Sequence, residues 1–418
     1  MARSMRIVDV CAFYTPFGGG VRTYVDAKLK AAARLGHEMI VIAPGERHEI
    51  AQRGAGAVVV TIPSPTLPVD RRYRYFHDQA ALHAALDEWR PDHVEASSPW
   101  SSATMVGRWD GPASRSLVMH ADPLAAYAYR WFGGIASTDR IDRWFDWFWR
   151  HMRGLDRLFD TIVCANRGLA RRLTEGGLDG CVTIPMGVEC GVFAPSLRTP
   201  RLRADALRSL GLGPDATLLL GVGRISGEKR WNMVIRAVAA AARQREVGLL
   251  LVGDGPKRPR LERLAARSGV AKLIPPITDR AALGRLLASA DALVHGCEAE
   301  TFCMVAAEAR ASGVPLIVPD RGAALDQLFP GAGLSYQAAS EDALRAAVER
   351  FIGRGPELQR ALAVRASAVR SMDEHFADLF AHYAGLGAAP AVRLQPDRAL
   401  VAPALPQVAF ARSSLRSS

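Results

Sequence analysis

The chain has 418 residues, of which 49% are hydrophobic and 23% are charged, and its formal net charge is +11. This length exceeds what one hydrophobic core usually supports, so we expect two globular domains and exclude a disordered or fibrous protein. The positive charge favours an anionic partner such as nucleic acid, anionic lipid or a phosphorylated substrate. Equally, the charge can reflect a composition that is basic throughout, without any anionic partner.

The cysteines and the N-terminal residues bear on the compartment. The six cysteines form no CxxC pair and no zinc-type spacing with histidine, which argues against a disulfide framework and a structural metal. Asp9 and the glycines at 18–20 interrupt the first apolar run, which is therefore too short for a signal peptide. No stretch approaches the roughly 20 apolar residues that cross a bilayer. We therefore expect a cytoplasmic protein.

In the first half of the chain, short apolar runs alternate with stretches of helical periodicity, which is typical of a parallel sheet covered by crossover helices. The predicted strands are Arg6–Cys11, Glu38–Ala43, Ala57–Ile62, His93–Ala96, Ser116–His120, Thr161–Ala165 and Cys181–Ile184, and the predicted helices lie near Val21–Leu35, Tyr75–Trp89 and Arg140–Leu158. The pattern predicts one doubly wound α/β unit over residues 1–195.

A segment rich in Pro, Gly and Arg, from Cys190 to about Arg201, has the composition of a linker. A second α/β unit follows over residues 196–371. Its predicted strands are Thr217–Val222, Gly248–Val252, Lys272–Ile274, Ala292–His295 and Pro315–Val318. We expect two Rossmann-like doubly wound domains that face a central cleft, with ligands bound outside the carboxyl ends of the strands.

The end of the chain divides into two parts. Apolar side chains recur at helical spacing through Phe376, Phe380 and Tyr383, which predicts a closing helix over residues 372–387. The Ala/Pro/Arg/Ser segment at 388–418 has no periodicity, and we expect it to be disordered.

Two glutamates, Glu300 and Glu308, flank a predicted helix start near Phe302. A helix N-terminus offers unpaired N–H groups and a positive dipole end to a diphosphate. Glu300 is placed to accept hydrogen bonds from the hydroxyls of a donor sugar, and Glu308 from those of a ribose. The spacing therefore suits a nucleotide sugar, and two solvent-exposed glutamates on a helix are the alternative interpretation.

The stretch from Glu300 to Ile317 resembles the paired-glutamate motif of the retaining GT-B glycosyltransferases of family 4, the glycosyl transferases group 1. That family includes bacterial mannosyl- and glucosyltransferases of envelope glycolipids and polysaccharides. Cys303 departs from the motif, because the family usually has Gly at this position. The resemblance covers about residues 5–386. It implies the GT-B fold, a closing helix that returns to the first domain, and a product that keeps the anomeric configuration of the donor sugar.

Arg224 and Lys229 follow the first strand of the second domain. They are suited to neutralise the charge that develops on a departing nucleotide diphosphate. The same spacing of Arg and Lys forms the phosphate-binding pair of the family. The resemblance also matches Gly253 to a Gly-x-Gly-Pro turn and brings the backbone near Ile277 to the base. Because no DxD motif is present, we expect no metal ion and no cofactor besides the nucleotide-diphosphate sugar.

In the first domain, Gly19 and Gly20 lead into a helix, and a glycine loop there lets the backbone approach a phosphate or a sugar. His120 ends a predicted strand. A histidine at such a position is commonly structural, but the resemblance places it facing the donor sugar near the anomeric carbon.

The predicted catalytic residues are His120, Glu300, Arg224 and Lys229. The predicted donor-binding residues are Gly19, Gly20, Arg224, Lys229, Gly253, Ile277, Glu300, Phe302, Cys303, Met304, Val305 and Glu308, and no metal ligand is predicted.

Four of the eight tryptophans lie with several arginines between Trp131 and Phe159. A helix there has one apolar face and packs on the first sheet in the simpler interpretation. In the other, Trp147, Trp149 and the arginines meet a lipid-linked acceptor or the anionic inner face of the plasma membrane.

We therefore expect a glycosyltransferase with a glycan or lipid-linked acceptor. A sugar-nucleotide epimerase and a non-catalytic nucleotide-sugar-binding protein of the same fold remain as alternatives. No complete GxGxxG, GxSxG or P-loop motif points to a dehydrogenase, a hydrolase or a nucleoside triphosphatase. We expect no nucleic-acid partner, because the arginines lack the clustering of such modules.

Overall fold

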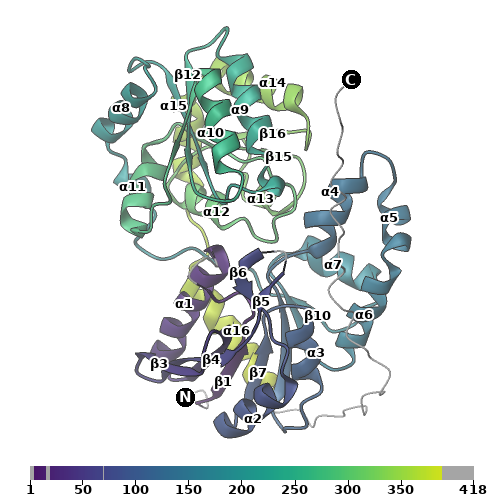
Figure 1. The fold of residues 1–418 in the computed structure, drawn as a ribbon. Helices are drawn as coiled ribbons and strands as arrows, with labels where there is room; N and C mark the ends of the chain where they lie inside the picture. Colours follow the sequence, from purple (N-terminus) through teal and green to yellow (C-terminus); the bar gives the residue numbers. More distant parts are fainter. Residues whose placement is uncertain (1–3, 16–18, 69, 388–418) are drawn as a thin grey trace.

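The computed structural model describes residues 4–15, 19–68 and 70–387 of the chain. These residues form two lobes, which are drawn in purple to blue and in teal to green in Figure 1. The segment at 388–418, for which disorder was expected, lies outside the described residues, as does Gly18 of the glycine loop.

The first lobe is built on an eight-stranded sheet with the strand order β10-β9-β8-β7-β1-β2-β4-β3. All neighbouring strands are parallel except β3 and β4. The strands are β1 Arg6–Val10, β2 Glu38–Gly45, β3 Glu49–Gly54, β4 Ala57–Pro63, β7 His93–Ala96, β8 Ser114–Met119, β9 Thr161–Cys164 and β10 Cys181–Thr183. The parallel strands read as apolar runs because helices bury them on both faces.

The helices of this lobe are α1 Gly19–Arg34, α2 Gln79–Trp89, α3 Ser101–Gly107, α4 Tyr129–Phe132, α5 Thr138–Trp144, α6 Asp146–Asp156 and α7 Arg167–Glu175, with a π-helical turn, η1, at Leu124–Ala128. The single helix predicted over Arg140–Leu158 is wrong, because Phe145 leaves helical geometry and separates α5 from α6. The start predicted at Tyr75 is also wrong. Asp78 caps α2 by accepting a hydrogen bond from the amide of Ala81, and the preceding residues form the hairpin of β5 Thr66–Leu67 and β6 Asp70–Arg74.

The second lobe contains a six-stranded sheet with the order β13-β12-β11-β14-β15-β16, and every neighbouring pair in it is parallel. The strands are β11 Thr217–Val222, β12 Val247–Val252, β13 Ala271–Ile274, β14 Ala292–Val294, β15 Leu316–Pro319 and β16 Gly333–Tyr336. The helices are α8 Pro200–Ser209, α9 Trp231–Ala241, α10 Arg258–Ser268, α11 Arg280–Ser289, α12 Met304–Ala311, α13 Ala323–Asp326, α14 Glu341–Gly353 and α15 Pro356–Arg365. β16 is short and begins at a glycine, and it was not among the predicted strands.

The last helix, α16 Met372–Gly387, returns to the first lobe and lies beside α1 (Figure 1). Two backbone hydrogen bonds join the start of α16 to the segment around Val188. The amide of Val188 donates to the carbonyl of Arg370, and the amide of Met372 donates to the carbonyl of Val188, each at 2.9 Å. Phe376 and Phe380 are buried under it. Burial of each phenylalanine side chain contributes about 1.5–3 kcal/mol to the stability of the fold. This packing therefore stabilises the attachment of α16 to the first lobe.

A buried group of charges lies under α16. Lys28 of α1 donates through Nζ to Asp9 Oδ2 (2.8 Å) and Glu95 Oε1 (2.6 Å), and all three side chains are fully buried. Tyr383 of α16 donates to Glu95 Oε2 (2.8 Å). Burial and the neighbouring Glu95 raise the pKa of Asp9. The helix therefore completes a polar network that would otherwise leave a buried carboxylate oxygen without this partner.

In the part of the chain that the structure describes, no helix combines the length and the apolar character needed to cross a bilayer.

Candidate active site

The loops at the carboxyl ends of β11 and β14 bring two predicted residues together. Lys229 lies in a 3₁₀ turn, η3 Gly227–Lys229, and its Nζ forms an ion pair with Glu300 from the loop after β14. Both side chains are mostly buried. Burial by itself would raise the pKa of Glu300, but Lys229 and His295 hold that pKa well below its usual range. Glu300 is therefore ionised, and Lys229 supplies a positive charge beside it.

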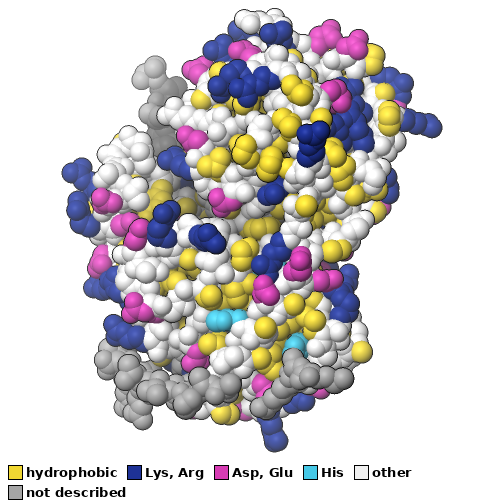
Figure 2. All heavy atoms as spheres, turned by 180° about the vertical axis from the view of Figure 1, so that it is seen from behind, with side chains coloured by type: hydrophobic (Ala, Val, Ile, Leu, Met, Phe, Trp, Pro, Cys, Tyr) yellow, Lys and Arg dark blue, Asp and Glu magenta, His cyan; other side chains and the backbone are white. Residues whose placement is uncertain are grey.

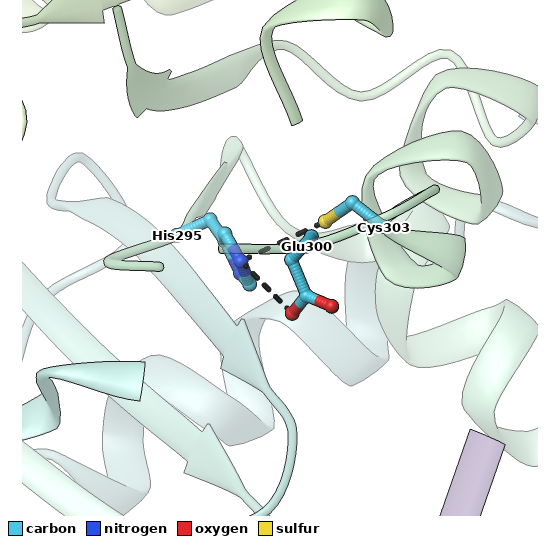
Figure 3. Close-up of side chains that lie close together, drawn as sticks. All are labelled: His295, Glu300 and Cys303. Atoms are coloured by element: carbon cyan, nitrogen blue, oxygen red, sulfur yellow. Dashed lines mark hydrogen bonds and ion pairs between the residues drawn. The ribbon is translucent and has the colours of Figure 1, made fainter. Parts of the chain in front are cut away.

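His295, at the end of β14, was not predicted as a site residue. Its Nε2 lies 3.4 Å from Glu300 Oε1 and 3.7 Å from the Sγ of Cys303 (Figure 3). The sequence did carry a signal for it, because His295 ends a strand at the cleft edge in the same way as His120. Burial lowers the pKa of His295, so the ring is neutral at neutral pH.

Cys303 occupies the position immediately before α12 with φ 59°, in the left-handed region. A residue with a Cβ in this conformation costs about 1–2 kcal/mol relative to the right-handed one, which gives a physical reason why Gly is usual at this position of the motif. The thiol is buried against His295. The helix ends at Ala311, and Gly313 follows its last turn with φ 64°, a left-handed conformation common just beyond helix ends.

Arg224 follows β11, and its side chain is half exposed. Its Nη2 lies 3.1 Å from Glu228 Oε1, so an unpredicted carboxylate holds the guanidinium at the cleft. A β-carbon placed on Gly227 would lie 2.6 Å from Arg130 Nη1 and 2.9 Å from Lys257 Nζ. A cation of the first lobe and a second cation of the other lobe thus converge on the turn that precedes Lys229.

His120 lies next to the Glu300 loop across the two lobes. Its carbonyl oxygen accepts a hydrogen bond from Thr301 Oγ1 (2.8 Å), and Asn166 Nδ2 donates to the carbonyl of Thr301. Its Nε2 lies 3.3 Å from the Oγ of Ser97, which in turn donates to Asp9 Oδ1 (2.7 Å). Burial lowers the pKa of His120 to about 4. The ring is therefore a neutral hydrogen-bonding group near Glu300.

The glycine loop faces the second lobe. Gly19 begins α1, and a β-carbon added to the next residue, Gly20, would lie 3.8 Å from Met304 Sδ at the start of α12. The two helix starts therefore meet across the cleft. Gly253 follows β12, and a β-carbon there would lie 2.0 Å from the carbonyl oxygen of Gly223, so only glycine fits.

The other predicted donor-binding residues lie around these loops. Phe302 is buried, Val305 is half-buried in the first turn of α12, and Ile277 is half-buried in the loop after β13. Glu308 is buried in the second turn of α12, and its Oε1 accepts a hydrogen bond from Arg280 Nη2 (2.6 Å). Sequence reasoning missed Arg280, which comes from α11 and carries no local signal. Burial raises the pKa of Glu308 despite this guanidinium.

A cavity of about 660 Å³ lies beside Thr301 and Asn166, whose hydrogen bonds join the two lobes. It is lined from the first lobe by Asp122 after β8 and by Arg167 and Arg172 of α7, and from the second lobe by Glu300 and Phe302 after β14 and by Gln327 after α13. Glu300 and Phe302 thus border both this cavity and the cleft that contains Lys229.

The face drawn in Figure 2 shows Lys and Arg scattered over both lobes with acidic side chains between them.

Two Rossmann-like lobes that face each other, with cations and a helix start at the edge of the second, define the architecture of a GT-B sugar transferase. Family models match nearly the whole length of both lobes. The model described as Glycosyltransferase Family 4 matches residues 18–192, and the one described as Glycosyl transferases group 1 matches residues 203–368.

Curated relatives are similar over most of the chain. A GDP-mannose-dependent alpha-(1-6)-phosphatidylinositol dimannoside mannosyltransferase of Mycobacterium tuberculosis is 31% identical over 365 residues, 87% of this chain and 92% of that protein. A GDP-mannose-dependent alpha-mannosyltransferase of the same species is 31% identical over 336 residues, 78% of this chain and 82% of that protein. The chain therefore belongs to glycosyltransferase family 4, as the resemblance implied.

Solved structures confirm the predicted fold. Sucrose-phosphate synthase from Thermosynechococcus elongatus has a TM-score of 0.74 at 19% identity, covering 93% of this chain and 100% of that one. HepE of Anabaena, solved with UDP and glucose, has a TM-score of 0.68 at 16% identity, covering 91% of this chain and 100% of that one. At these identities the likeness concerns the fold alone.

Proposed function

We propose that this glycosyltransferase transfers mannose from GDP-mannose to a glycolipid or a polysaccharide precursor with retention of the anomeric configuration. The nucleotide and the sugar are proposed because both curated relatives described above are named for GDP-mannose. The observation that carries the proposal is the pairing of Lys229 with Glu300 at the start of α12, because it places a cation, a carboxylate and a helix N-terminus in one cleft.

In the proposed donor complex, Lys229 and Arg224 bind the diphosphate. Each is held by a carboxylate, Glu300 and Glu228 respectively, and an incoming diphosphate offers each cation a more highly charged anion. Both cations then stabilise the negative charge that develops on the leaving nucleotide as the glycosidic bond breaks. The proposal requires no metal ion, since these cations and the start of α12 supply the neutralising charge.

Glu300, once released from Lys229, accepts hydrogen bonds from hydroxyls of the donor sugar. His120 lies on the opposite wall of the cleft and is neutral, so it can donate or accept a hydrogen bond without adding charge near the anomeric carbon. Glu308 contributes to ribose binding through the carboxylate oxygen that Arg280 does not occupy.

For the acceptor we propose a lipid-linked glycan that reaches the cleft from the surface of α4 and α5. Trp149 is buried and Trp147 is half-buried against the core, which agrees with the simpler interpretation that this segment packs on the first sheet. The side chains that are exposed there are Tyr127, Trp131, Ile135 and Trp144, with Arg140 and Arg143 beside them. This mixture of aromatic and basic side chains suits peripheral contact with an anionic membrane on the inner face of the plasma membrane.

The test is a reaction of purified protein with GDP-mannose and a mannosylated phosphoinositide acceptor, followed by NMR of the product. We expect an α-linked mannose and released GDP. Conversion of GDP-mannose to another sugar nucleotide without acceptor would instead establish an epimerase, and no turnover together with tight GDP-mannose binding would establish a non-catalytic binder. Thermal-shift measurements with GDP-mannose, UDP-glucose and ADP-glucose identify the base, because a bound ligand stabilises the folded state.

A further inference from the structure

Three potential metal ligands of different chemistry meet in the loop after β14. These are the imidazole of His295, the carboxylate of Glu300 and the thiol of Cys303, which point toward one another in Figure 3. Their ligand atoms all lie within 4.8 Å of one another. His295 Nε2 is 3.4 Å from Glu300 Oε1 and 3.7 Å from Cys303 Sγ.

These separations fit a tetrahedral zinc-type ion. Zinc lies about 2.0–2.1 Å from a histidine nitrogen, about 2.0–2.2 Å from a carboxylate oxygen and about 2.3 Å from a thiolate, so ligand atoms of one site are spaced about 3.3–3.7 Å apart. The two printed separations from Nε2 lie in that range. Three protein ligands leave a fourth position for water, and the nitrogen and sulfur donors favour a thiophilic ion over magnesium.

The cluster is held by the backbone as well as by packing. Cys303 is fixed at φ 59° between the loop and α12, and His295 is fixed by the end of β14. Both side chains are buried. The three ligands themselves therefore need little rearrangement to close on an ion, although the Cys303 thiol must lose its proton as the metal–sulfur bond forms and Lys229 must leave Glu300.

The carboxylate of Glu300 already forms an ion pair with a cation. Lys229 pairs with Glu300 through the same oxygen, Oε1, that faces His295. A divalent ion and the ammonium group cannot both occupy the space beside Oε1, because two positive charges at contact distance in a buried site repel each other strongly. Binding of the ion must therefore move Lys229 away from Glu300.

We infer that His295, Glu300 and Cys303 bind a thiophilic divalent cation such as Zn²⁺, and that this binding competes with the donor. The competition rests on the proposed function, in which Lys229 and Glu300 bind the diphosphate and the sugar. The cation acts as an inhibitor of the donor site and takes no part in the transfer step.

The first test measures metal binding alone, on full-length protein treated with a chelator. A Cys190→Ser background removes an exposed thiol that would bind metal non-specifically. Titration with Cd²⁺ should give a thiolate-to-metal charge-transfer band that saturates at one equivalent. Zn²⁺ affinity is measured by competition with a chromophoric chelator, and it should rise with pH because binding releases the thiol proton.

Cys303→Gly is the diagnostic variant, because glycine suits the left-handed backbone at this position and preserves folding. It should abolish the charge-transfer band and weaken Zn²⁺ binding by at least about ten-fold. Cys297→Ser is the matched control, since Cys297 is a buried thiol of the same loop outside the cluster, and it should retain both signals. Absence of the band in the parent protein, or equal Zn²⁺ affinity in Cys303→Gly, would overturn the inference.

The second test measures Zn²⁺ affinity with and without GDP-mannose. We expect GDP-mannose to weaken Zn²⁺ binding. Unchanged Zn²⁺ affinity at a GDP-mannose concentration that shifts the melting temperature of the metal-free protein would overturn the competition. Failure of GDP-mannose to shift that melting temperature would instead count against the proposed donor, and the metal titration would stand independently of it.

Discussion

At the scale of single residues, the candidate site contains charged side chains that neutralise one another in pairs. Lys229 and Arg224 each rest on a carboxylate, and Glu308 rests on Arg280. Such pairs keep partly buried charges from being left uncompensated. They also mean that the removal of one partner changes the ionisation of the other, so variants at this site should be read through both members of a pair.

We expect Lys229→Ala to reduce the transfer rate by at least about 100-fold, since one preorganised charge on a leaving group is worth that much. The measurement is release of GDP from GDP-mannose in the presence of acceptor. Lys272→Ala, which removes an exposed lysine of β13, is the control and should transfer at the parent rate. Near-parent activity of Lys229→Ala would contradict the phosphate-binding role.

Substitutions of Cys303 separate the cost of its left-handed backbone conformation from the chemistry of its thiol. Cys303→Gly should be more stable than Cys303→Ala by about 1 kcal/mol, because alanine keeps a Cβ in the left-handed conformation and glycine does not. The measurement is the midpoint of thermal unfolding of the two variants, compared under identical conditions. An equal midpoint would mean that the backbone relaxes at this position.

At the scale of elements, α16 attaches the end of the chain to the first lobe through polar contacts made in a buried setting. His375 lies 3.0 Å from the hydroxyl of Tyr24 through Nε2 and 2.9 Å from the carbonyl of Pro185 through Nδ1. Burial lowers its pKa to about 3, with Arg370, Lys28 and His120 acting in the same direction. The helix is therefore docked with a neutral histidine.

This predicts how stability depends on pH. An unfolded histidine has a pKa near 6.5, so between about pH 6.5 and pH 3 the unfolded chain binds a proton that His375 in the folded chain does not. The free energy of unfolding should be fully developed above pH 6.5 and should fall as the pH is lowered through that window. In His375→Gln the slope of this loss should be smaller, as measured by denaturant unfolding at several pH values. An unchanged slope would mean that other groups, such as His120, dominate it.

The α4–α5 segment is the other element with a distinct prediction. Trp131→Ser and Trp144→Ser should each weaken binding to anionic liposomes several-fold at low salt, because they remove exposed aromatic rings from the proposed contact. Phe329→Ser, which removes an exposed aromatic ring from the second lobe, should bind as the parent does. Cosedimentation measures this, and no liposome binding by the parent protein would count against membrane contact.

At the scale of the whole molecule, hydrogen bonds link the two lobes over the cleft. Thr301 donates to the carbonyl of His120, a residue 181 positions away in the chain, and Asn166 donates to the carbonyl of Thr301. These hydrogen bonds join the lobes beside the cleft that contains His120 and Glu300. Relative motion of two domains of one chain is the default expectation when their interface is not large and hydrophobic.

We therefore expect Thr301→Val to favour a more open arrangement while leaving each lobe folded. The radius of gyration in small-angle scattering should increase, and the KM for GDP-mannose should rise more than kcat falls, since the cleft must close again on binding. Thr174→Val, which removes a hydrogen bond within α7, is the control and should change neither quantity. The same radius of gyration in both variants would show that this bridge does not set the lobe arrangement.

The sequence by itself determined the class of fold and the local motifs. Apolar runs and helical periodicity are properties of neighbouring residues, so the two α/β units, the closing helix at 372–387 and the two glutamates around a helix start could be predicted. It also pointed to the family, because motif spacing is a local property. The predicted helix bounds failed at Phe145, which interrupts the expected helix, and at Asp78, which caps α2 later than expected.

Only the tertiary structure decided which groups face each other. Lys229 meets Glu300 across 71 residues, Arg280 meets Glu308 from a different helix, and His295 turns its ring toward Cys303. These contacts arise because parallel strands deliver their carboxyl ends to one edge of a sheet, and strand order is not readable from the spacing of residues along the chain. The burial that sets each pKa has the same origin, since it depends on what the other lobe and α16 cover.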